Sequence, residues 1–87
     1  MDEVVKIVGI ARREFDGQNG EKVRGYSLYL TESRRGVIGE AAYNVFLSDA
    51  KFRPILDVMG SLEACVGTGV CVMWNRYGKV DRLELAQ

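Results

Sequence analysis

Histidine is absent from the 87-residue chain, and this absence narrows the chemistry that the protein can perform. It removes the commonest general base, the commonest metal ligand and every Ser–His or Cys–His nucleophile arrangement. The carboxylates form no paired acid/base motif, and Gly67-Thr68-Gly69 lacks the Gly-Lys and the helix that a phosphate-binding loop requires. The sequence therefore predicts no enzymatic activity, no catalytic residue and no small-molecule substrate.

Cysteine is also scarce. The two cysteines, Cys65 and Cys71, are separated by five residues, a spacing that matches neither a CxxC motif nor a zinc-ligand pair. Apolar residues flank both, which is typical of buried, reduced thiols in a cytoplasmic protein. We therefore expect no metal and no other cofactor.

Long apolar segments and export signals are missing as well. The longest uncharged stretch, residues 64–75, is far shorter than the roughly 20 apolar residues of a membrane span. No signal-peptide pattern is visible, and the single proline excludes a Pro-rich low-complexity chain. With 47% hydrophobic and 28% charged residues, the sequence predicts one folded domain over residues 1–87 without a membrane partner.

Five stretches have the composition of β-strands: residues 4–15, 23–31, 37–47, 66–74 and 80–86. Gly9 interrupts the first stretch and predicts a bend or bulge there. Apolar residues at positions 52, 55, 56 and 59 predict a short helix that begins near residues 51–53 and ends by Gly60. This order predicts a mainly β fold, a small five-stranded OB-type barrel with one short helix between strands three and four; an SH3-like barrel is the main alternative.

Charge is balanced overall but unevenly distributed. Twelve basic and twelve acidic side chains cancel. Residues 12–35 hold six basic and four acidic groups, and residues 74–82 hold three basic and one acidic, so these segments together carry +4. If these two segments lie side by side in the folded protein, the chain has a basic face for a partner although its net charge is zero.

Basic and aromatic side chains alternate in the two hairpin loops and the strand faces with which OB barrels bind ligands. This mixture suits single-stranded nucleic acid, because cations follow the phosphates and flat rings stack on any base. The predicted contact residues are Arg12, Arg13, Phe15, Lys22, Arg24, Tyr26, Tyr29, Arg34, Arg35, Arg76, Tyr77, Lys79 and Arg82. We assign Tyr43, Phe46, Phe52 and Trp74 instead to the core or to a partner interface.

Two interpretations of Tyr26 stay open. Because side chains two positions apart in a strand point the same way, Tyr26 shares a face with Arg24, as a base-stacking ring beside a phosphate contact would. It also shares that face with Leu28 and Leu30, which favours a core position. A ligand-facing Tyr26 requires that Leu28 also meet the ligand, or that a bulge near Gly25 reset the alternation.

Two segments and the total length resemble the helix-destabilising, single-stranded-DNA-binding proteins of filamentous bacteriophages. Arg24-Gly25-Tyr26-Ser27-Leu28 is similar to that family's basic-x-Tyr-Ser-Leu strand. The C-terminal Tyr77-Gly78-Lys79-Val80-Asp81-Arg82-Leu83-Glu84-Leu85 is similar to its aromatic-Gly…Asp-Arg-Leu-x-Leu ending. The resemblance implies an OB-like homodimer that coats replicating single-stranded DNA cooperatively.

The same resemblance implies roles for single residues. Tyr26 and Leu28 would meet bases, Arg24 and Arg82 would contact phosphates, and Tyr77 would lie near the tip of a loop at the dimer axis. Glu84 stands where the family tends to have a second arginine.

The expected function is therefore sequence-independent binding of single-stranded DNA by a phage or mobile-element protein in the cytoplasm. Electrostatic capture by basic side chains would be followed by stacking of bases on aromatic rings. RNA is a second possible ligand, since a stacking face accepts either sugar. The alternative function is a small β-barrel module for protein–protein contact, in which the aromatic side chains form an apolar patch.

Overall fold

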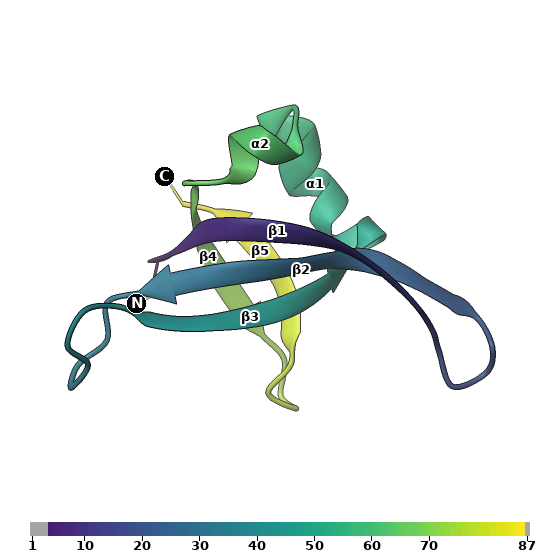
Figure 1. Ribbon diagram of the computed structural model, residues 1–87, viewed down its shortest axis with the longest axis horizontal. Helices are drawn as coiled ribbons and strands as arrows, with labels where there is room; N and C mark the ends of the chain where they lie inside the picture. Colours follow the sequence, from purple (N-terminus) through teal and green to yellow (C-terminus); the bar gives the residue numbers. More distant parts are fainter. Residues whose placement is uncertain (1–3, 87) are drawn as a thin grey trace.

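The computed structural model describes residues 4–86 (Figure 1). Five strands, one helix of 11 residues and a single helical turn follow one another in the order β1 (Val4–Asp16), β2 (Lys22–Glu32), β3 (Ala41–Ser48), α1 (Asp49–Met59), α2 (Leu62–Cys65), β4 (Gly69–Trp74) and β5 (Val80–Leu85). The mainly β composition and the helix between the third and fourth strands confirm the predicted element order.

The first strand joins the two halves of the sheet. Its start, Val4–Lys6, pairs with β4, and from Lys6 onwards it pairs with β2. The register shifts between Ile7 and Gly9, so that Val8 is left out of the ladder, as the glycine in mid-strand predicts. Because of this bend, β1 can pair with both β2 and β4, although these two strands run in different directions.

All strand pairs are antiparallel, and the order across the sheet is β3-β2-β1-β4-β5. Among the described residues no ladder joins β3 to β5, so the sheet is open and the predicted closed barrel is not observed. In Figure 1 the β4–β5 hairpin crosses the three long strands, and α1 and α2 lie on one side of them. The turn between β1 and β2 projects well beyond the rest of the sheet.

One core cluster lies between the sheet and α1. Alternate residues of β2, Leu28 and Leu30, are buried together with Leu47 from β3. Phe52 and Ile55 of α1 complete this layer, as the spacing of apolar residues in the helix predicts. Burial of these side chains stabilises the sheet face that the helix covers.

Three boundaries differ from the prediction by two residues or more. β3 begins at Ala41 and not at residue 37, because Gly36 and Gly39 adopt left-handed φ angles of 85° and 86° that turn the chain. β4 begins at Gly69, after the helical turn α2 and Gly67 with φ 92°. α1 begins at Asp49, which places Pro54 inside the helix at the cost of one backbone hydrogen bond.

Candidate nucleic-acid interface

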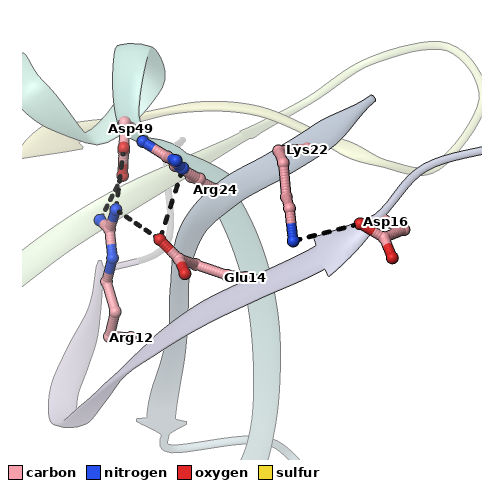
Figure 2. A network of polar contacts seen from close by, with 6 residues as sticks. All are labelled: Arg12, Glu14, Asp16, Lys22, Arg24 and Asp49. Atoms are coloured by element: carbon pink, nitrogen blue, oxygen red, sulfur yellow. Dashed lines mark hydrogen bonds and ion pairs between the residues drawn. The ribbon is translucent and has the colours of Figure 1, made fainter. Parts of the chain in front are cut away.

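The inner face of the β1–β2 hairpin carries a network of paired charges (Figure 2). Arg12 donates two hydrogen bonds to the Asp49 carboxylate at the start of α1, of 2.6 and 3.2 Å. Glu14 lies 3.8 Å from Arg12 and 3.4 Å from Arg24. The ammonium of Lys22 lies 3.4 Å from Asp16. We call these six residues the ion-pair cluster; its acidic members neutralise three of the predicted phosphate contacts.

Arg12 is the residue that connects the hairpin to the helix. Its hydrogen bonds to Asp49 raise the pKa of the guanidinium above its ordinary value. The guanidinium also lies 5.0 Å from the centre of the Tyr26 ring. Arg12 therefore joins the hairpin to α1, and its guanidinium is already paired with an acidic side chain.

Tyr26 and Leu28 belong to the core face. The Tyr26 ring lies 5.2 Å from the ring of Phe52, and Leu28 is fully buried. Pairing between β1 and β2 is regular from Ile10 to Asp16, so no bulge near Gly25 resets the alternation. This burial contradicts the predicted contact between Leu28 and a base. It also favours the core interpretation of Tyr26.

The opposite, outer face of the same strands exposes aromatic rings. Phe15 and Phe46 pack edge to face with ring centres 5.5 Å apart, and Tyr29 is 44% exposed on the same side of β2. Gly25 makes room for this arrangement, since a Cβ there would lie 2.6 Å from the tip of the Phe46 ring. Arg13 projects from this face and donates a hydrogen bond of 3.4 Å to Ser27.

Trp74 extends the row of rings toward the last hairpin. The register of β4 and β5 shifts between Met73 and Trp74, and the indole is 53% exposed. It borders a groove of about 380 Å³ together with Val45, Phe46, Lys79 and Val80. We call Phe15, Tyr29, Phe46, Trp74 and Tyr77 the aromatic track; these are the exposed ones among the eight aromatic residues.

The turn of the last hairpin is stiffened by one side chain. The Asn75 carboxamide oxygen accepts hydrogen bonds from the backbone N–H groups of Tyr77 and Lys79, of 2.8 and 3.1 Å. Tyr77, 74% exposed, has the guanidinium of Arg76 5.3 Å from its ring centre. A ring and two cations are therefore held at the tip of a short, ordered loop.

The nine predicted basic contacts divide into two groups. Five lie in ion pairs with acidic side chains: Arg12, Lys22, Arg24, Arg34 and Arg82, the last with Asp81 and Glu84. Within residues 4–86, the other four form no ion pair: Arg13, Arg35, Arg76 and Lys79. Three of these four belong to the outer face or to the last hairpin, beside the aromatic track.

In the described part of the chain no group of three or more potential ligand side chains could hold a metal ion. Both cysteines are free; Cys65 is buried, which raises the pKa of its thiol, whereas Cys71 is only half-buried. No helix among residues 4–86 is both long and apolar enough to cross a membrane.

The sequence assigned two members of the aromatic track, Phe46 and Trp74, to the core or a partner interface; both are exposed, so a core position is wrong for them and the partner interface stays a prediction. Alternation along β3 contained the signal for Phe46, because Val45 and Leu47 on either side of it face the core. Trp74 had no such signal, because a register shift in a strand that is apolar on both faces decides its exposure. Phe52, in contrast, is buried as predicted.

The two segments that resemble the filamentous phage proteins occupy different parts of the fold. Residues 24–28 lie in β2, with Tyr26 and Leu28 on the core face, and residues 77–85 form the last turn and β5. Comparisons of the chain with protein-family models, with curated proteins and with solved structures found no significant match.

Proposed function

We propose that this protein binds single-stranded DNA along the aromatic track, as a non-enzymatic binding protein with an OB-type fold. The strand order, the bent first strand and the helix between β3 and β4 support the OB assignment. The track runs from the first hairpin across the outer face of β2 and β3 to the last hairpin, the region where OB folds bind oligonucleotides. A filamentous phage or mobile-element origin, action in the cytoplasm and a homodimeric state belong to the same proposal.

The observation that carries the proposal is the position of Trp74. Its indole is half exposed in a groove that also contains Phe46 and Lys79, whose ammonium has no ion-pair partner among residues 4–86. A large ring exposed beside a cation is what base stacking next to a phosphate requires, and each stacked base contributes about 1–3 kcal/mol. Stacking accepts every base, so this mode of binding needs no particular sequence.

The charge pairing limits how much of the affinity comes from phosphates. Log affinity for single strands falls with log salt by about 0.7 per neutralised phosphate. If only Arg13, Arg35, Arg76 and Lys79 are available, the slope is no steeper than about −3. Stacking then contributes the larger share of the affinity.

Anisotropy of labelled oligo(dT), titrated with protein at several salt concentrations, tests the proposal. We expect saturable binding with a slope between about −1 and −3, and a Trp74→Ala variant that binds about tenfold more weakly or worse. Phe52→Leu serves as the control for a core aromatic change. Oligo(U) in the same assay decides between DNA and RNA.

The second candidate function is a module for protein–protein contact. It is favoured by the neutral ion-pair cluster and by the apolar character of Phe15 and Phe46, which together resemble an interface more than a strongly basic groove. Absence of oligo(dT) binding at low salt would select this function.

A further inference from the structure

A second hollow lies on the other side of Trp74, at the end of β2. It has a volume of about 260 Å³ and is lined by Glu32, Arg34, Ala42, Tyr43 and Trp74. Glu32 and Ala41 are the last residue pair between β2 and β3. The hollow therefore lies at the end of these two strands, where the sheet is open. We call it the Glu32 pocket.

Glu32 is the only buried charged residue in the described part of the chain, with 6% of its side chain exposed. Arg34 forms an ion pair with its Oε1 atom, and the Arg34 guanidinium lies 6.0 Å from the ring centre of Tyr43. A buried carboxylate costs free energy unless several donors satisfy it, and each oxygen can accept two hydrogen bonds. The carboxylate can therefore accept further N–H groups from a ligand in the pocket.

We infer that the Glu32 pocket binds one guanine base of the DNA strand, an inference that rests on the proposed function. The Watson–Crick edge of guanine presents, in order, the O6 acceptor, the N1–H donor and the N2–H donor. The Glu32 carboxylate accepts from the two donors, and the adjoining Arg34 donates to O6. Trp74 supplies an exposed flat ring against which the purine lies, and the Tyr43 ring has the Arg34 guanidinium over it.

The other bases fit this arrangement less well. Thymine has one N–H between two carbonyl oxygens, and both oxygens would face the carboxylate. Adenine offers one amino group beside an acceptor nitrogen, so it makes one hydrogen bond in place of two. Cytosine offers one amino group to the carboxylate and needs two donors from Arg34, and its smaller ring fills less of the pocket.

The size of the pocket agrees with a purine. A cavity of about 150 Å³ holds a benzene ring. The 260 Å³ of the Glu32 pocket therefore leaves room for the second ring of guanine. The neighbouring groove behind Trp74 is lined mainly by apolar side chains and Lys79, and no carboxylate lines it. Base preference therefore belongs to the Glu32 pocket and non-selective stacking to the groove.

Competition between short oligonucleotides tests the inference. Oligo(dT) with one central dG should bind about tenfold more tightly than oligo(dT) alone, because a bidentate hydrogen-bonded pair gives discrimination of at least that order. Inosine, which lacks the 2-amino group, should give an intermediate affinity, and a central dA or dC should give little gain. Equal affinities for dG and dT would overturn the inference and leave the proposed function standing, whereas a larger gain for dC than for dG would overturn guanine as the ligand.

A variant and a free nucleotide separate failure of the pocket from failure of the proposed function. Glu32→Gln should reduce the preference for dG to about twofold or less while oligo(dT) affinity is kept; Glu63→Gln, on exposed α2, is the control and should change neither. Trp74 is the only tryptophan, so guanosine monophosphate should quench its fluorescence at a concentration at least tenfold lower than thymidine monophosphate, which can stack on the indole but cannot pair with Glu32. Preferential quenching by the guanine nucleotide without oligonucleotide binding would support the pocket alone, and equal quenching by the two nucleotides, or none by either, would overturn it.

Discussion

The two faces of the β1–β2 hairpin use their charged residues in opposite ways. On the inner face Arg12, Glu14 and Arg24 form a continuous series of ion pairs that ends at α1. On the outer face Arg13 has no acidic partner within the described residues and stands beside Phe15. A segment with a positive net charge therefore does not always form a basic surface. Side chains alternate between the two faces of a strand, and half of the basic ones here lie on the face where neighbouring acidic side chains neutralise them.

The largest expected effect concerns Gly25, which lies beneath the outer face. A Cβ at this position would lie 2.2 Å from the Leu47 carbonyl oxygen and close to Phe46. Gly25→Ala should therefore push β3 away from β2 and lower the free energy of unfolding by about 3 kcal/mol. Urea denaturation measures this change. Gly9→Ala is the control, because its Cβ would meet Tyr29 at an ordinary 3.4 Å.

Tyr26 on the inner face should affect stability and not DNA affinity. Its half-buried ring packs on Phe52, so Tyr26→Ala should cost about 2 kcal/mol, less than the 3–5 kcal/mol of a fully buried Phe. The folded variant should bind oligo(dT) as the native protein does. Weaker binding by a variant of native stability would place Tyr26 in the interface.

Arg12 and Arg13 are adjacent in the chain and lie on opposite faces, which makes them a matched pair. Arg13→Gln should flatten the dependence of log affinity on log salt by about 0.7, because one phosphate contact is lost. Arg12→Gln should leave that slope unchanged and lower the melting temperature, because Asp49 loses both hydrogen bonds. Equal slopes for the two variants would remove the distinction between the faces.

The smallest expected effect concerns Arg82. Its Nε lies 3.1 Å from a Glu84 carboxylate oxygen, and both residues are exposed. Glu84→Gln should remove the nearer of the two acidic partners of Arg82, leaving Asp81 at 3.9 Å, and should steepen the salt slope by up to about 0.7, with a change in stability within about 0.5 kcal/mol. Glu84→Arg should tighten binding further. Weaker binding by either variant would exclude Arg82 from the phosphate path.

Local patterns in the sequence predicted most of the fold. Gly9 indicated the break in β1, and the apolar spacing from Phe52 onwards indicated α1. The late start of β3 was not predictable in the same way, because residues 37 and 38 are apolar yet lie in an exposed loop that Gly36 and Gly39 turn. The open seam between β3 and β5 depends on how distant segments meet, which no local pattern contains.

The candidate site was predictable only in part. Phe15, Tyr29 and Tyr77, which the sequence predicts as ligand contacts, are exposed, and their contact with nucleic acid stays a prediction. The pairing of Arg12 with Asp49 joins residues 37 positions apart, and the exposure of Trp74 depends on a register shift. Both depend on tertiary structure.

Trp74 gives the most direct measurement of whether the aromatic track binds single strands. Because Trp74 is the only tryptophan, the tryptophan fluorescence of the native protein comes from this residue alone when unlabelled oligo(dT) is added. We expect its fluorescence to fall to a saturating level at the same oligonucleotide concentration at which anisotropy shows binding, because a base stacks on the indole. Binding of oligo(dT) with unchanged Trp74 fluorescence would place the nucleic acid elsewhere on the protein and refute the track as its site.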